Sequence, residues 1–328
     1  DKANSAWTLN LMSLTSRMIG DLTNSMEYVE KALSISETVD DKDLKANLFR
    51  TAGLLHQRLE NRMKALEFFQ KSLILAEELN NRTLIAYAKQ NIGRILFLEG
   101  KYAEAMDNFQ KCLTLNEAVG SKRHLFYTID AIGTLYQIQG DHAQALEYRR
   151  KGLKLSEEIG NKFQIINALI GIASLYTDKG DFTQALESAK RAVAMSIEVG
   201  ERENLPHALY LVGFAYHGLK QYEESRLAFE EAISAIELTR ASIAGQDSRS
   251  AFFAGYWQTY DAYIDLLMLM HREQPNKGYD VQAFQMSERA RAQMEASVAM
   301  QILRRQARIG GAIMIAGFGL AGAATSIA

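Results

Sequence analysis

Residues Gly140–Gly160 read GDHAQALEYRRKGLKLSEEIG, and this stretch decides the fold because its pattern recurs every 40 residues. One position of the pattern always holds a small residue: Ser25, Ala65, Ala105, Ala145, Ala185 and Ser225. A second small-residue position follows seven residues later: Ala32, Ser72, Cys112, Gly152, Ala192 and Ala232. Repetition at a fixed period of this length predicts a solenoid, in which each unit buries its apolar face against its neighbours.

Each unit contains two apolar stripes with helical spacing, separated by a turn. Most turns hold a glycine, namely Gly20, Gly100, Gly140 and Gly180, but two copies carry Glu60 and Lys220 instead. An aspartate follows three of these glycines, at Asp21, Asp141 and Asp181, where it suits the N-cap of the second helix. The second helix is expected to end at Asn80, Gly120, Gly160 and Gly200. The small residues allow the two helices to approach closely.

The order of small residue, bulky residue three positions later, turn, and Ala-x3-Phe-x2-Ala resembles the tetratricopeptide repeat. The phenylalanine position of that pattern is only half kept: Val29, Phe69, Phe109, Arg149, Ala189 and Phe229. The period also exceeds the family's usual 34 residues, and such longer repeats resemble those of kinesin light chains and bacterial peptide-sensing regulators. The resemblance implies an all-α, right-handed α-solenoid of six helix-turn-helix repeats over residues 1–240.

The period breaks after Arg240, and residues 241–308 are predicted to form a capping pair of helices. A long helix is expected over 248–272 with Asp247 as its cap, followed by a turn at 274–278 and a second helix over about 280–308. Such a pair would close the apolar end of the solenoid, as terminal repeats must.

The same region resembles the connector that joins tetratricopeptide repeats to a CHAT domain, a caspase- and separase-like cysteine protease module. The similar stretches are QDSRSAFFAGYWQTYDAYIDLLMLMH (246–271) and PNKGYDVQAFQMSERARA (275–292). No Cys or His follows residue 292, so no catalytic residue can be carried over. The resemblance implies the regulatory half of a CHAT-type protease system without its catalytic domain.

Composition argues against several classes of function. A net charge of −2 gives no basic face for nucleic acid, so no nucleic-acid partner is expected. Cys112 is the one cysteine, which excludes an internal disulfide, and its small-residue position predicts a buried structural thiol. His56, Tyr136, Tyr176 and Tyr216 belong to the packing pattern, and the other histidines lack metal-ligand spacing. We therefore expect no metal, no cofactor and no enzymatic activity.

The resemblance places the first helix of each repeat along a concave groove. The exposed positions predicted there are Asn10, Arg17, Asn47, Arg50, Gln57, Tyr87, Gln90, Arg94, Tyr127, Asp130, Asn167, Ser174, His207, Tyr210 and His217. Amides bind peptide backbone, guanidinium groups bind carboxylates, and tyrosines supply rigid contact area. These types predict a groove for a protein or peptide segment; the alternative is a polar face that binds nothing in particular.

Residues 309–328, IGGAIMIAGFGLAGAATSIA, carry no charge and have the length of a bilayer span. Arg304, Arg305 and Arg308 precede them and would hold the repeats on the cytoplasmic side. The alternatives are a small-residue helix packed on the protein, the remnant of a following domain, and a disordered tail.

The sequence as a whole predicts a non-enzymatic scaffold that binds a protein or peptide partner, with membrane lipid as a second partner if residues 309–328 insert. Its predicted location is cytoplasmic, at the inner face of a membrane in that case. Two alternatives stay open: the regulatory half of a CHAT-type protease system, and a membrane-perturbing effector whose apolar tail is masked. The oligomeric state is also open.

Overall fold

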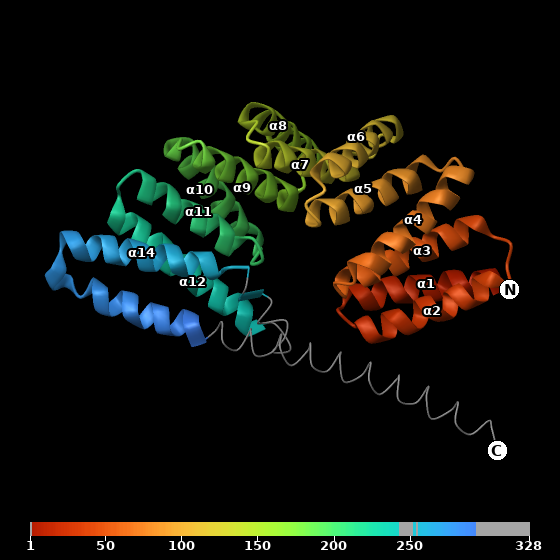
Figure 1. The fold of residues 1–328 in the computed structure, drawn as a ribbon, viewed down its shortest axis with the longest axis horizontal. Coiled ribbons are helices and arrows are strands. Elements are labelled where there is room, and N and C mark those ends of the chain that lie inside the picture. The colour runs from red at the N-terminus through yellow and green to blue at the C-terminus, as the bar shows by residue number, and fades with distance from the viewer. Residues whose placement is uncertain (1, 243–251, 254, 293–328) are drawn as a thin grey trace, which may run out of the picture. The chain divides into compact units, whose positions relative to one another are not determined.

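The computed structural model describes residues 2–242, 252–253 and 255–292, and those residues contain helices but no strand (Figure 1). The chain divides into two compact units, which we call the N-terminal unit (Asp1–Gln164) and the C-terminal unit (Ile165–Ala328). The division falls within α9 (Lys162–Asp178).

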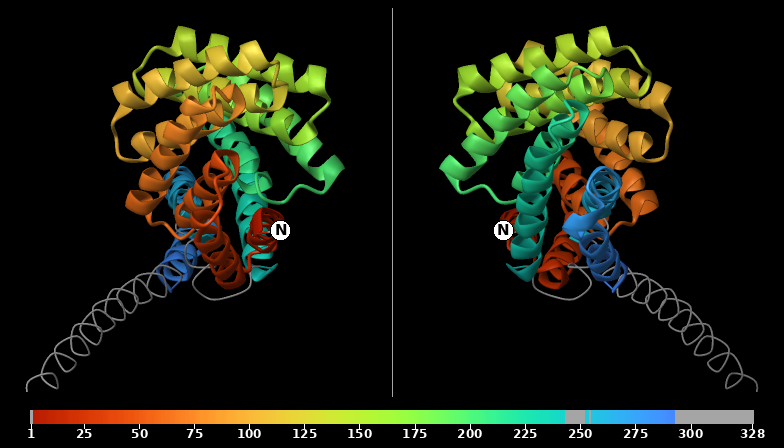
Figure 2. Two further views of the ribbon diagram at one scale, coloured as in Figure 1. Left: turned by 90° about the vertical axis from the view of Figure 1, so that its right-hand side faces the viewer. Right: turned by 90° about the vertical axis from the view of Figure 1, so that its left-hand side faces the viewer.

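The N-terminal unit consists of antiparallel helix pairs that stack in chain order (Figures 1 and 2). The pairs are α1 (Lys2–Met18) with α2 (Leu22–Glu37), α3 (Lys42–Arg58) with α4 (Arg62–Glu78), α5 (Arg82–Leu98) with α6 (Tyr102–Val119), and α7 (Lys122–Ile138) with α8 (His142–Ile159). Helices α2, α4 and α6 also pack on the first helix of the next pair. The predicted all-α solenoid of helix-turn-helix repeats is therefore confirmed.

The C-terminal unit continues the pattern with α10 (Phe182–Val199), α11 (Leu205–Gly218) and α12 (Tyr222–Ser242). It also contains α14 (Trp257–Glu273), the short 3₁₀ helix η1 (Pro275–Lys277) and a helix over 279–292. Helix α14 begins at Trp257, later than the 248 expected from sequence, because Gly255 and Tyr256 form a turn closed by bonds to the carbonyls of Phe252 and Phe253. The predicted turn at 274–278 is present, and Gly278 adopts φ of 72°.

The predicted caps hold the second helices. Each aspartate side chain accepts a hydrogen bond from the backbone N–H three residues later: Asp21 from Asn24 (3.1 Å), Asp141 from Gln144 (3.0 Å) and Asp181 from Gln184 (3.3 Å). Gly120, Gly160 and Gly200 end their helices in the left-handed conformation. Local sequence therefore fixes both ends of these helices.

The turn between the two helices of a repeat requires a left-handed residue whatever its identity. Gly100 and Gly180 have φ of 75° and 73°, and the non-glycine residues Glu60 and Lys220 have φ of 57° and 61°. A side chain in this conformation costs about 1–2 kcal/mol. The repeat geometry thus imposes the conformation even where the sequence does not favour it.

A glycine and a phenylalanine form the tightest joint within a repeat. A Cβ atom added to Gly53 would lie 2.7 Å from the ring of Phe69, and one added to Gly93 would lie 2.8 Å from the ring of Phe109. Gly213 and Phe229 repeat this contact at 2.8 Å in the C-terminal unit. Real Cβ contacts are not this short, so only glycine lets the ring fill the joint.

Cys112 is fully buried, as predicted, and its thiol donates to the carbonyl of Ala86 at 3.2 Å. Burial raises the pKa of this thiol, although hydrogen bonds with Thr128 and Asn116 act in the opposite direction. The thiol therefore serves packing in the small-residue position.

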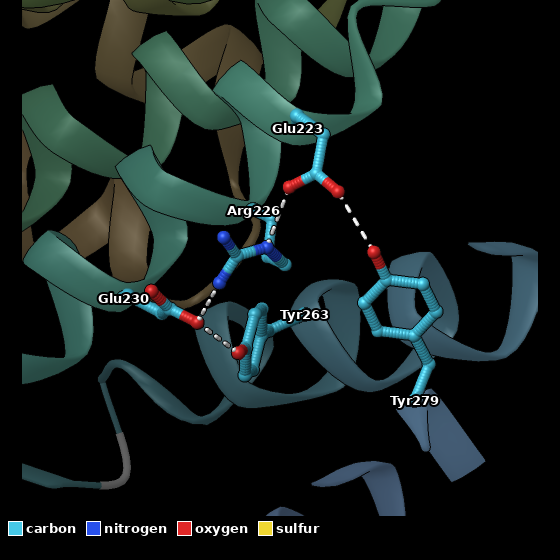
Figure 3. Close-up of polar contacts among 5 residues, drawn as sticks. All are labelled: Glu223, Arg226, Glu230, Tyr263 and Tyr279. Atoms are coloured by element: carbon cyan, nitrogen blue, oxygen red, sulfur yellow. Dashed lines mark hydrogen bonds and ion pairs between the residues drawn. The ribbon is translucent and has the colours of Figure 1, made fainter. Parts of the chain in front are cut away.

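Helix α12 is joined to the helices that follow it through hydrogen bonds from tyrosine hydroxyls, and not through a glycine–phenylalanine contact. Glu223, Glu230 and Glu237 stand seven residues apart on α12. Each carboxylate accepts a hydrogen bond from a tyrosine that follows α12: Tyr279 to Glu223 (2.7 Å), Tyr263 to Glu230 (2.6 Å) and Tyr260 to Glu237 (2.7 Å). Figure 3 shows Arg226 between Glu223 and Glu230, to which it donates at 2.8 and 2.6 Å. We call this set of bonds the tyrosine–glutamate ladder.

The ladder encloses an apolar cluster in which Ile236, Leu266 and Leu267 are fully buried. Burial alone would raise the pKa of Glu237, but hydrogen bonds from Tyr260 and Arg240 and the charges of Arg240 and Arg289 outweigh it, so this pKa lies below its ordinary value. The carboxylate is thus stabilised in its charged form between helices.

Several predictions concern residues outside the described ranges: the apolar segment 309–328, its flanking Arg304, Arg305 and Arg308, and the part of the connector beyond 292. Within the described ranges, no helix is long and apolar enough to cross a bilayer.

Replacing Lys220 with glycine should stabilise the protein by about 0.5–1 kcal/mol, because glycine adopts the required φ without strain, partly offset by its greater freedom when unfolded. Gly180→Ala, at the equivalent turn with φ of 73°, should destabilise by a similar amount. Urea unfolding of both variants checks this; a Lys220→Gly variant less stable than wild type would contradict it.

Glu237→Gln should lower the free energy of unfolding at pH 7 by about 1–3 kcal/mol, since it removes a carboxylate that accepts bonds from charged and neutral donors. The pKa of Glu237 is lower in the folded protein, so its stabilisation is present above the unfolded value and is lost as the pH falls through the folded one. The difference between variant and wild type should therefore shrink below about pH 4. Glu224→Gln, exposed on the same helix, should have little effect at either pH.

Candidate functional site

The N-terminal unit contains a hollow of about 890 Å³. Its walls come from the first helices of the repeats, α3, α5 and α7, with Arg17 near the end of α1 and Phe109 from α6. These helices carry labels in Figure 1. The volume of the hollow falls in the range of ligand-binding cavities.

Helical spacing brings the lining side chains together. On α5 they include Tyr87, Gln90, Asn91 and Arg94, which share one face. On α7 they are His124, Tyr127, Asp130, Ala131 and Thr134, and on α3 they include Leu54, Gln57 and Arg58. Glu60 lines the hollow from the turn that follows α3.

Tyr87 is held from two sides. The guanidinium carbon of Arg50 lies 5.1 Å from the centroid of its ring, a cation–π distance. The ring of His124 meets it edge to face with centroids 5.5 Å apart. Tyr127, in contrast, is 43% exposed. One aromatic side chain is therefore fixed in the wall, and a second offers free surface to a ligand.

The hollow carries unpaired positive charge. Arg17, Arg58 and Arg94 line it, and none of them forms an ion pair with a residue in the described part of the chain. The Nε atom of Arg17 is shielded from solvent and lacks a hydrogen-bond partner among the described residues. Guanidinium groups in this state suit carboxylate or phosphate groups of a ligand.

The two acidic residues that line the hollow differ in their partners. Glu60 is exposed in the turn, but Asp130 forms an ion pair with the buried Arg149 on α8. One Arg149 nitrogen pairs with Asp130 Oδ1, and the other donates to Thr134 Oγ1 at 2.8 Å. The Arg149 side chain is only 8% exposed, whereas that of Asp130 is 34% exposed. The charge of Asp130 is therefore compensated from inside the protein.

The structure gathers seven of the predicted groove residues around this hollow: Arg17, Gln57, Tyr87, Gln90, Arg94, Tyr127 and Asp130. Gln90 is only 9% exposed, so the prediction that it is exposed was wrong. Three other predicted groove residues of the N-terminal unit do not line the hollow. Asn10 is 2% exposed because α1 packs on both α2 and α3, so the prediction that it is exposed was wrong. Asn47 is half-buried and donates to the carbonyl of Asp43 in its own helix, and Arg50 supports Tyr87.

The remaining predicted groove residues belong to the C-terminal unit. Asn167 and Ser174 are on α9, and His207, Tyr210 and His217 are on α11. The Tyr210 ring packs against Phe214 and Phe229, with centroids 5.9 and 6.0 Å away, and burial raises the pKa of its hydroxyl. Tyr210 is therefore half-buried in the packing of this unit rather than freely exposed.

Sequence reasoning missed Arg58, His124 and Thr134. Arg58 directly follows the predicted Gln57, and Thr134 stands one turn beyond the predicted Asp130, so each continues a face already identified. The sequence also contained a sign of the ion pair beneath the hollow. Arg149 is a charged residue in a packing position, and such a residue requires a partner that compensates its charge. In the described ranges, no group of three or more His, Cys, Asp or Glu residues could hold a metal ion.

Comparison with protein families identifies the repeats. The family model described as "Tetratricopeptide repeat" matches residues 44–118, 82–158, 122–198 and 164–237. These overlapping matches together span 44–237, more than half of the chain. A search of the curated proteins found no significant match.

Several solved structures share the fold. The apo form of RapI aligns with a TM-score of 0.66 at 15% identity, covering 88% of this chain and 98% of that chain. A signal transduction ATPase from Pyrococcus horikoshii with a tetratricopeptide repeat sensor gives 0.68 at 15%, covering 92% and 44%. The apo form of the quorum sensor NprR from B. thuringiensis gives 0.58 at 16%, covering 88% of each chain. At these identities the similarity establishes the fold.

Gly93→Ala should destabilise the protein by about 1–3 kcal/mol, because its Cβ would meet the buried Phe109 ring that lines the hollow. Gly133→Ala is the matched control. Its Cβ would stand 3.4 Å from Tyr148 Cβ, an ordinary contact, since Arg149 replaces the ring there. This variant should be neutral or stabilised by up to about 1 kcal/mol through helix propensity. Equal destabilisation of the two variants in thermal unfolding would contradict the glycine–phenylalanine joint.

Proposed function

Since this chain belongs to the tetratricopeptide repeat family, we propose that it is a non-enzymatic scaffold whose N-terminal unit binds a segment of a protein or peptide partner. The observation that carries the proposal is the convergence of unpaired guanidinium groups, amides and an exposed tyrosine in one hollow. The guanidinium groups can bind carboxylates of a ligand, the amides can bond to its backbone, and the tyrosine ring supplies contact area.

The form of the hollow favours a chain-like ligand. Its lining passes over the first helices of four successive repeats, from Arg17 on α1 to Thr134 on α7. Packed helices stand about 8–10 Å apart, so this lining extends over about 25–30 Å. An extended peptide advances about 3.3 Å per residue, and about eight residues would cover that length. A compact metabolite would occupy only part of the surface.

The fold relatives agree with a recognition role. One of them is a quorum sensor, and another uses tetratricopeptide repeats as the sensor of a signal transduction ATPase. In this chain the proposal depends on the hollow itself, because the identities of 15–16% carry no residue-level correspondence.

We expect the full chain to enrich specific linear peptides from a random 12-residue phage-display library. Arg94→Glu should weaken the tightest selected peptide at least about tenfold, a loss typical of an interface hot spot. Arg82→Glu is the matched control, since Arg82 is exposed on the same helix and outside the hollow, and it should change affinity less than about twofold. Fluorescence anisotropy measures both.

Two outcomes would oppose the proposal. One is the absence of any peptide enriched over uncoated support after repeated selection. The other is selected peptides that bind Arg94→Glu and Tyr87→Ala as tightly as wild type, which would place their site elsewhere on the chain.

A further inference from the structure

The phenylalanine position of the repeats holds an arginine at one place only among the six copies, at Arg149. Phe69 and Phe109 fill the same position in the two preceding repeats, each against a glycine. At Gly133 the aliphatic part of Arg149 takes the place of the ring, with Cδ 3.5 Å from where a Cβ would lie. Packing alone would be served by phenylalanine, so the guanidinium group requires another explanation.

A buried guanidinium group is unfavourable unless a partner compensates its charge. Arg149 is compensated by Asp130 and Thr134, which stand one turn apart on α7. Both partners line the hollow. The buried arginine therefore acts on groups that face the proposed ligand.

The consequence is a change in the charge that a ligand meets. The acidic lining residues are Glu60 and Asp130, and the basic ones are Arg17, Arg58 and Arg94. With Asp130 neutralised by Arg149, three guanidinium groups face a single uncompensated carboxylate. Without Arg149, the half-exposed Asp130 would repel an acidic ligand and attract a basic one.

We infer that Arg149 is a positioning residue that sets the charge preference of the hollow, and that the bound segment is acidic, with aspartate or glutamate side chains held by Arg17, Arg58 and Arg94. This inference rests on the proposed function and deepens it. The half-buried amide of Gln57 lies in the same lining and suits a polypeptide backbone. Three arginines on a chain of net charge −2 give no continuous basic track for nucleic acid.

The test selects peptides from the same random library with three full-length proteins: wild type, Arg149→Phe, and Arg149→Phe with Asp130→Asn. Wild type should enrich Asp and Glu at least about threefold over the starting library. Arg149→Phe should lower that enrichment, because an uncompensated Asp130 then opposes the three arginines. The double variant should restore the acidic preference, since no charge remains at position 130. A purely structural role of Arg149 would not give this restoration.

Arg149→Phe should fold, because it recreates the glycine–phenylalanine joint of Gly53 and Gly93, and circular dichroism with thermal unfolding verifies this. A second measurement uses wild type alone: changing every Asp and Glu of its tightest peptide to Asn and Gln should weaken binding at least about tenfold. The weakening should itself diminish as the salt concentration rises.

The outcomes separate the two proposals. If wild type enriches no peptide, the proposed function fails. If it enriches peptides without acidic residues, or if folded Arg149→Phe keeps the full acidic enrichment of wild type, the inference about Arg149 fails while the peptide-binding function stands. Binding of a labelled 20-nucleotide single strand at the hollow in place of any peptide would overturn both.

Discussion

The close approach of the two helices of a repeat at a small residue is the constraint on which the repeats depend, and in three of the six it takes the form of a glycine against a phenylalanine. At Gly53 and Gly93 no side chain fits, because the facing ring occupies the space where a Cβ would stand. The turn between the two helices is left-handed in repeats with this contact, as at Glu60, and equally in repeats without it, as at Gly180. Stacked pairs then leave one face of each first helix free to line a surface.

The fourth repeat shows what happens when this joint is altered. Arg149 retains the aliphatic bulk of the missing ring but introduces a charge into the packed interior. That charge is compatible with folding only because α7 offers Asp130 and Thr134 one turn apart. Since both residues also line the hollow, the presence of arginine in place of phenylalanine at this core position changes the charge of the lining of the hollow. Packing and the charge of the hollow are thereby linked through one side chain.

Much of the fold could be predicted from sequence because local signals and the repeat agree. Asp141 and Gly160 mark the ends of one helix in the sequence and do so in the structure. The shared face of Tyr87, Gln90 and Arg94 on α5 could also be predicted, since these residues follow helical spacing. The burial of Asn10 could not be predicted, because it depends on α1 packing against two helices at once. The Arg149–Asp130 pair, between residues nineteen positions apart, likewise requires the spatial arrangement.

The two ways of joining helices in this chain suit different tasks. A glycine–phenylalanine joint is apolar, and its geometry is set only by the complementary shapes of the two residues. The same joint can therefore recur in several repeats of a stack. The tyrosine–glutamate ladder instead combines buried rings with hydrogen bonds to charged groups, which are stronger and specific in geometry. After Arg240 the 40-residue period ends, so the regularly spaced small residues that allow glycine–phenylalanine joints are no longer present. The change from apolar joints to the ladder after α12 thus follows from where the repeats stop.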